Sequence, residues 1–162
     1  MLFRSMIPVE LVGVRIEMPS NQPIVLLKEI SGTRYIPIWV GTVEATAIAF
    51  AEQKLKSARP LTHDLAVSLI SATGCQLRSV HITKIESGIF YADLVLIDAT
   101  GQEQKVTARP SDAVAIAIRT GATILVSEEL ISEVGIDLPE AGDDEIEKFK
   151  EFLDEVSPED FA

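Results

Sequence analysis

The stretch Glu44-Ala-Thr-Ala-Ile-Ala49 is matched 68 positions later by Asp112-Ala-Val-Ala-Ile-Ala117. Each stretch begins with an acid and continues with small and β-branched residues, and neither contains Pro or Gly. Alanine favours helix, and an acid in the first turn complements the positive end of the helix dipole. Both stretches are therefore predicted to belong to buried helices that carry a carboxylate in the first turn.

The same shift of 68 also aligns the strands that precede the two helices. The repeated order is strand, strand, strand, helix, which favours an internal duplication with pseudo-repeats at about residues 9–56 and 77–120. A competing match between Ala58-Arg-Pro60 and Ala108-Arg-Pro110 has a shift of 50 and is shorter. The alternative to a duplication is that two alanine-rich helices resemble each other by chance. The positions aligned by the longer shift are Val12, Val14 and Ile16 with Val80, Ile82 and Lys84, and residues 23–30 with 91–98.

Apolar runs bounded by turn residues define the remaining elements. Strands are expected at about 9–18, 24–30, 34–40, 77–85, 89–97, 104–108 and 123–126, and helices at 43–56, 62–73, 110–120 and 145–156. The predicted fold class is α+β, with mixed, largely antiparallel sheets and an internally duplicated β-β-β-α unit packed with helices.

The charge of the chain is unevenly distributed. Of 162 residues, 47% are hydrophobic, which suits one globular domain, and acids exceed bases by 11. Residues 128–162 hold 14 acids and two bases, whereas residues 1–127 hold 11 acids and 12 bases. The excess negative charge is thus in the tail, and the body is not excluded from binding a polyanion. We expect a domain at residues 1–142 and an acidic C-terminal helix and tail at 143–162.

Several classes of protein are excluded. No apolar run is long enough to span a membrane and the N-terminus lacks a signal-peptide pattern, so a cytoplasmic protein without membrane contact is expected. One cysteine, Cys75, and two histidines are too few for a structural zinc site, so any metal is expected to have oxygen ligands. The motifs of P-loop, dinucleotide, serine hydrolase and zincin enzymes are absent.

Polar side chains concentrate at the predicted helix starts. In the duplicated register Glu44 and Asp112 are equivalent, so a pseudo-twofold axis would bring two carboxylates together, where they could hold Mg²⁺ or Mn²⁺ or divide acid and base roles. The segments Arg59-Pro-Leu-Thr-His-Asp64 and Arg109-Pro-Ser-Asp112 each place an Arg before a helix start, where free backbone N–H groups suit a phosphate. The structural alternative is helix initiation, with the acids complementing the dipole and Thr62 or Ser111 as caps.

Three motifs together resemble the bifunctional nuclease domain family: Tyr35-Ile-Pro-Ile-Trp-Val-Gly41 running into Glu44-Ala, Arg59-Pro-Leu-Thr-His-Asp-Leu65, and Ala108-Arg-Pro-Ser-Asp-Ala113. The resemblance covers roughly residues 9–136, and the acidic ending is similar to that of actinobacterial members. It implies a stand-alone bacterial domain of mixed α and β structure, a homo-oligomer, and degradation of DNA and RNA as nucleic-acid substrates. It supplies no settled catalytic residues.

Hydrolysis of both DNA and RNA requires water as the nucleophile, because DNA lacks the 2′-hydroxyl. A divalent metal, Mg or Mn, held by Glu44, Asp64 and Asp112 would neutralise the developing charge, with His63 as a base. We therefore predict that Glu44, His63, Asp64 and Asp112 are catalytic. The predicted phosphate-binding residues are Arg59, Thr62, Arg109 and Ser111. The alternative is a noncatalytic oligomeric structural or binding module.

Overall fold

Eight strands form one mixed sheet in the computed structural model, which describes residues 5–137. Their order in the sheet is β6-β5-β4-β7-β1-β2-β3-β8, and neighbouring strands are antiparallel except for β4 and β7. This sheet, with its helices, confirms the predicted α+β class. The strands are β1 (Met6–Glu17), β2 (Gln22–Glu29), β3 (Arg34–Trp39), β4 (Gln76–Glu86), β5 (Ile89–Ile97), β6 (Glu103–Ala108), β7 (Thr123–Ser127) and β8 (Ile136–Asp137).

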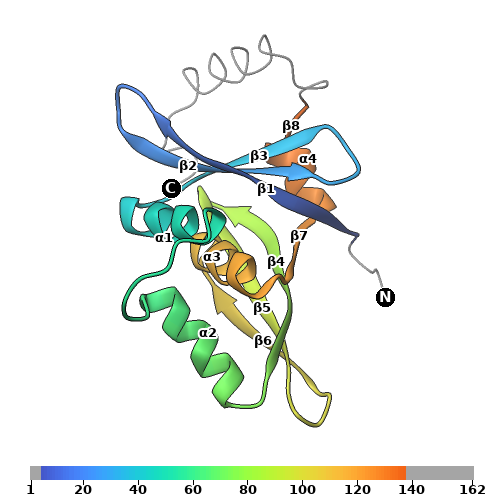
Figure 1. The fold of residues 1–162 in the computed structure, drawn as a ribbon. Coiled ribbons are helices and arrows are strands. Elements are labelled where there is room, and N and C mark those ends of the chain that lie inside the picture. The colour runs from blue at the N-terminus through green and yellow to red at the C-terminus, as the bar shows by residue number, and fades with distance from the viewer. Residues whose placement is uncertain (1–4, 138–162) are drawn as a thin grey trace.

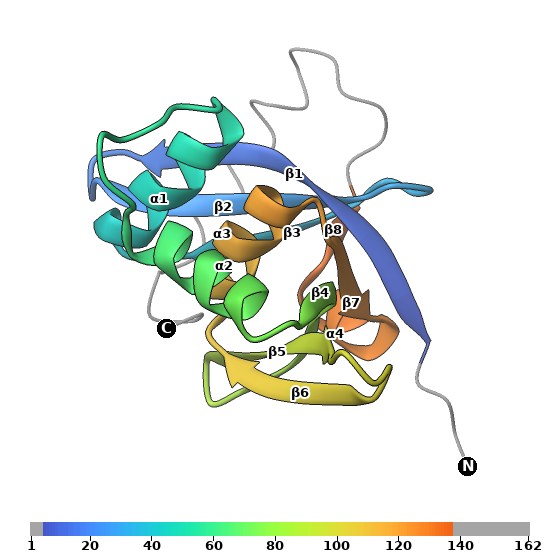
Figure 2. The same cartoon turned by 60° about the horizontal axis from the view of Figure 1, so that its bottom comes forward.

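The helices within the described residues are α1 (Thr42–Glu52), α2 (Thr62–Ala72), α3 (Pro110–Thr120) and α4 (Glu128–Val134). Helix α1 packs on β1 and β2, α3 packs on β4, β5 and β7, and α2 lies outside α3 (Figures 1 and 2). Helix α4 packs against β3, β4 and β7. None of the helices between residues 5 and 137 is long and apolar enough to cross a membrane.

The sheet reflects the repeated order of elements. Strands β1, β2 and β3 followed by α1 correspond to β4, β5 and β6 followed by α3. The two sets of strands lie on either side of β7, in mirrored order. Since β7 is antiparallel to β1 and parallel to β4, the two sets also run in opposite directions. A twofold axis normal to the sheet at β7 would produce this arrangement.

Helix α3 is the centre of the core because it packs on the sheet and is also in contact with both α1 and α2. Its residues Ala113, Val114, Ala115 and Ala117 are at most 1% exposed. Small side chains at these positions allow the helices and the sheet to approach closely, and the branched residues of both halves fill the space between them. These branched core residues include Val25, Leu27, Ile36, Ile48, Val80, Ile82 and Val126.

An ion-pair cluster outside this core joins β2 and β3 to α4. The Arg34 guanidinium donates to Glu29 at 2.6 Å and to Glu128 at 3.0 Å. Hydrogen bonds from the Arg34 side chain lower the pKa of Glu29, although burial acts in the opposite direction. Arg34 thereby satisfies a carboxylate that is 7% exposed.

The structure differs from the sequence-based expectation at two helices. Helix α1 ends at Glu52, four residues early, because Lys54 adopts a left-handed backbone conformation with φ 55° that stops the helix. Helix α4 was not predicted; Ser127 caps it by accepting a hydrogen bond from the backbone N–H of Leu130. The predicted helix at 145–156 lies outside the described residues.

Candidate functional site

Side-chain contacts connect the starts of α1, α2 and α3. Each helix has an acid at its third residue: Glu44 in α1, Asp64 in α2 and Asp112 in α3. None of the three N-cap residues accepts a hydrogen bond through its side chain. The first turns therefore keep backbone N–H groups that an anion or a neighbouring carboxylate can satisfy.

The guanidinium of Arg109 binds two of these acids. Its Nη2 atom lies 3.0 Å from Glu44 Oε1 and 3.1 Å from Asp112 Oδ1, and its Nε donates to Asp112 Oδ2 at 2.8 Å. The hydrogen bonds to Asp112, opposed by burial, raise the pKa of Arg109. The Arg109 side chain is nevertheless 64% exposed, so the guanidinium also faces solvent.

Asp112 joins the Arg109 contact to His63 at the start of α2. His63 Nε2 lies 2.8 Å from Asp112 Oδ1, and the His63 side chain is 11% exposed. Burial raises the pKa of Asp112, but the hydrogen bonds from Arg109 and His63 outweigh it, so the pKa lies below its usual value. An ionised carboxylate only accepts hydrogen bonds, so Nε2 donates and Nδ1 of a neutral His63 is left as an acceptor.

Asp64 makes a different set of contacts. Its Oδ2 accepts from the backbone N–H of Leu61 at 2.9 Å, and its Oδ1 accepts from Arg119 Nε at 2.8 Å. The hydrogen bond from Arg119 lowers the pKa of Asp64, with the Leu61 N–H acting in the same direction. Asp64 therefore anchors the start of α2 to the end of α3, whereas Glu44 and Asp112 share Arg109.

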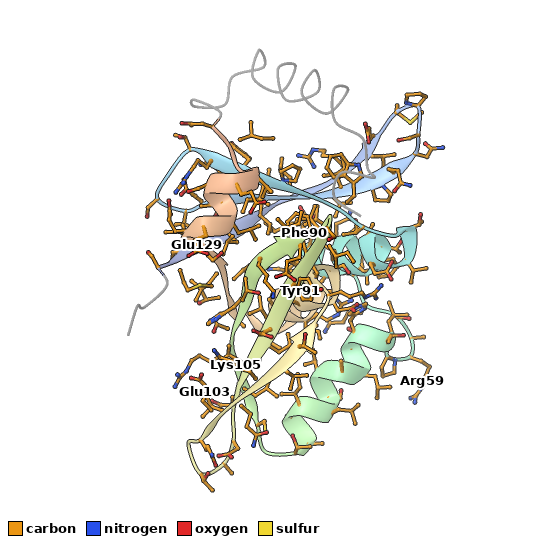
Figure 3. All side chains as sticks on the ribbon, turned by 180° about the vertical axis from the view of Figure 1, so that it is seen from behind. Arg59, Phe90, Tyr91, Glu103, Lys105 and Glu129 are labelled. Carbon is orange, nitrogen blue, oxygen red and sulfur yellow. The ribbon has the colours of Figure 1, made fainter. Side chains whose placement is uncertain are left out.

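Within residues 5–137, no side-chain hydrogen bond or ion pair connects the other predicted phosphate-binding residues to Arg109. Arg59 is exposed in the loop before α2, and its side chain points away from the helices (Figure 3). Thr62 is exposed as the first residue of α2, and Ser111 is buried as the second residue of α3. The prediction that Thr62 or Ser111 is an N-cap is wrong. Leu61 and Arg109 are the N-caps, because Asp64 binds the Leu61 N–H and Pro110 occupies the first helical position.

The three acids predicted to hold a divalent metal are each paired with an arginine. Asp64 binds Arg119, and Glu44 and Asp112 both bind Arg109. Across the described part of the chain, no group of three or more His, Cys, Asp or Glu side chains is placed to hold a metal ion. As arranged, the three acids do not form the predicted ligand set.

Arg119 is a site residue that the sequence did not reveal. Besides Asp64 it binds the carbonyl oxygens of Ala47 in α1 at 3.1 Å and Ala115 in α3 at 2.9 Å. Its side chain is 10% exposed, so it holds the three helices together from within. An Arg in the last turn of a helix is typical of dipole compensation, and nothing in the sequence identifies partners 55 and 72 positions away.

Comparisons with known proteins identify relatives over most of the chain. An uncharacterised protein of Mycobacterium tuberculosis is 49% identical over 162 residues, covering 94% of this chain and 96% of the relative. Bifunctional nuclease 1 of Arabidopsis thaliana is 28% identical over 126 residues, and bifunctional nuclease 2 of Oryza sativa subsp. japonica is 28% identical over 127. Each plant match covers 76% of this chain and 39% of the plant protein.

The family match includes every residue of the contact network. Residues 25–139 match the bifunctional nuclease domain, so Glu44, His63, Arg109 and Asp112 all lie inside the matched region. The motifs at 35–45, 59–65 and 108–113, from which the resemblance was first inferred, lie there as well. The chain belongs to the bifunctional nuclease domain family.

Proposed function

We propose that this protein is a nuclease that hydrolyses phosphodiester bonds of DNA and RNA at the starts of α1, α2 and α3. The observation that carries the proposal is the linked set of His63, Asp112 and Arg109, in which an oriented imidazole lies next to an exposed guanidinium. Membership of the family, and the names of the plant relatives, support the same activity.

Arg109 is proposed to bind the scissile phosphate. Its guanidinium presents several donors in a planar fork that suits two phosphate oxygens, and the carboxylates of Glu44 and Asp112 hold it in place. The uncapped first turns add backbone N–H donors beside Thr62 and Ser111. A phosphate would reach the Arg109 guanidinium from its solvent-exposed side.

His63 is proposed to be the general base. Asp112 fixes the tautomer in which Nε2 carries the proton, so Nδ1 accepts a proton from the attacking water. The water oxygen forms a bond to phosphorus, the bond from phosphorus to a sugar oxygen breaks, and that oxygen takes up a proton from solvent. Because the 2′-hydroxyl of RNA takes no part in this step, the same residues would act on DNA and RNA.

The divalent metal, Mg or Mn, stays a prediction that needs its own test. Glu44 and Asp112 would become available to a cation only if Arg109 turned from them toward a substrate phosphate. Asp64 would also have to leave Arg119. A chelator-controlled assay decides whether hydrolysis needs a metal, and restoration by Mg²⁺ or Mn²⁺ would identify it.

The competing function is a noncatalytic homo-oligomeric module. One observation favours it: the N-cap residue Leu61 and, within α2, Leu65 and Leu69 follow one another at four-residue spacing and are 36%, 51% and 57% exposed. Such a row at four-residue spacing suits packing against a second copy. A homo-oligomer is equally compatible with nuclease activity, so size measurement alone does not separate the two functions. The proposed location of either form is the cytoplasm.

The nuclease proposal is tested with highly purified parent protein, His63→Gln and Glu86→Gln. Glu86 is an exposed residue of β4 that contacts Lys84. Single-stranded DNA and RNA are incubated with each protein, with and without chelator. We expect cleavage by the parent and by Glu86→Gln, and a large loss in folded His63→Gln. Equal activity in all three proteins would indicate a contaminating nuclease or a different site, and contradict the assignment.

A further inference from the structure

The loop between α1 and α2 carries an unusual concentration of positive charge. Residues 53–61, here called the basic loop, contain Lys54, Lys56 and Arg59 and no acid. All three side chains are exposed, and the loop lies at the outer edge of the molecule (Figures 1 and 2). Elsewhere in residues 1–127 acids and bases nearly balance, so this loop is locally distinct.

The three cations of the basic loop have no internal partner within the described chain. No ion pair between residues 5 and 137 involves Lys54, Lys56 or Arg59. By contrast, Arg34 and Arg119 each bind a carboxylate. The charge on the basic loop is therefore available to an external anion.

Helix electrostatics does not explain all three cations. Lys54 and Lys56 follow the end of α1, where the dipole favours positive charge. Arg59 precedes the start of α2, where the same dipole opposes it by roughly 0.3–1 kcal/mol. Lys54 also occupies a left-handed position, φ 55°, that glycine or asparagine would fill with less strain. Folding alone therefore does not account for Arg59, or for a lysine at position 54.

The basic loop is held in place beside the proposed site. At one end Leu55 N–H donates to the Phe50 carbonyl oxygen at 2.9 Å, and at the other Leu61 N–H donates to Asp64 at 2.9 Å. Arg59 precedes His63 by four residues, so their Cα atoms are at most about 14 Å apart. A chain bound at Arg109 and His63 could continue along the loop.

We propose that the basic loop binds the phosphodiester backbone of nucleic acid adjacent to the bond that is cleaved. The inference rests on the proposed nuclease function and names the feature that recognises the substrate. Lys54, Lys56 and Arg59 contact phosphates by charge and read neither base nor sugar. DNA and RNA strands are therefore bound alike.

The test compares the parent with two triple variants that remove the same positive charge. The loop variant carries Lys54→Gln, Lys56→Gln and Arg59→Gln. The control variant carries Arg78→Gln, Lys84→Gln and Lys105→Gln. These three residues are exposed, the first two in β4 and Lys105 in β6 (Figure 3). Binding of a labelled 20-nucleotide DNA strand, and of RNA with the same sequence, is measured by fluorescence anisotropy over a range of salt concentrations in chelator.

Removing three phosphate contacts should reduce the slope of log affinity against log salt by about 2 for either strand. The control variant should keep the parent slope. An unchanged slope in the loop variant, an equal change in the control, or an effect on one nucleic acid only would overturn the inference. If the parent binds with the loop-dependent slope but never cleaves, the proposed hydrolysis fails and the loop assignment stands. If the parent cleaves and the loop variant keeps the salt slope of the parent, the loop assignment fails and the proposed hydrolysis stands.

Discussion

Glu44 and Asp112, 68 positions apart in the chain, bind the same nitrogen of one guanidinium, Arg109 Nη2, at 3.0 and 3.1 Å. The two acids occupy the third position of helices that correspond in the repeated order of elements. The residue that corresponds to Arg109 in the first half is Gly41, so the halves differ at this position. One guanidinium therefore serves two carboxylates, and the site is asymmetric although the sheet around it is nearly symmetric.

Replacing Arg109 should affect cleavage far more than stability. We expect Arg109→Gln to lose about 1 kcal/mol of unfolding free energy, because the side chain is largely exposed, and about 100-fold in cleavage rate. Arg109→Lys keeps the charge but loses the planar fork, and should recover only part of the rate. The measurements are urea unfolding and initial rates on single-stranded DNA. Parent-like cleavage by folded Arg109→Gln would exclude Arg109 from phosphate binding.

Replacing Arg119 should affect stability more than replacing Arg109 does. Arg119 is nearly buried and joins α1, α2 and α3, so Arg119→Gln leaves Asp64 and two carbonyl oxygens without their donor. We expect a loss of about 3 kcal/mol in urea unfolding. The Arg78→Gln variant, which removes an exposed Arg, serves as control and should lose less than about 1 kcal/mol. Similar losses in both variants would show that the three-helix connection contributes little.

Glu29 should make stability depend on pH in the acid range. Its pKa is lowered in the folded protein, mainly by the Arg34 hydrogen bonds, from an ordinary value of 4.5. The folded state therefore binds the Glu29 proton more weakly than the unfolded state does. The resulting stability is present above pH 4.5 and is lost as pH falls through the lower, folded pKa. Unfolding free energies measured from pH 6 to pH 3 should fall less steeply in Glu29→Gln than in the parent, and identical slopes would refute this.

The sequence was sufficient to predict the fold where the signals are local, as at the ends of a helix. Helix α3 has the predicted limits, because Pro110 fits the first helical position and Gly121 ends the helix with φ 75°. The repeated order of elements also followed from the shift between Glu44 and Asp112. The network around these acids depended on partners that the sequence does not pair, such as Arg119 with Asp64. The N-caps were misassigned because the residues expected as caps are already helical: Thr62 begins α2, with Asp64 accepting the N–H of Leu61, and α3 begins at Pro110.

The acidic C-terminal segment should weaken nucleic-acid binding by charge repulsion. Deleting residues 143–162 removes nine of the chain's 25 acids together with Lys148 and Lys150. We expect the remaining body to fold and to bind a DNA strand more tightly at low salt, with the difference decreasing as salt screens the charges. Circular dichroism checks folding and anisotropy measures binding. Unchanged binding at low salt would leave the segment without an electrostatic role.

The most direct test of the proposed function is the cleavage rate of Asp112→Asn on DNA and RNA strands of the same sequence. The amide keeps the size of Asp112 but removes the negative charge that fixes His63 and Arg109. We expect both rates, per folded molecule, to fall together by about 100-fold or more. Equal cleavage by folded Asp112→Asn and the parent would contradict the account, because the residue joining the base to the phosphate-binding Arg would then be dispensable.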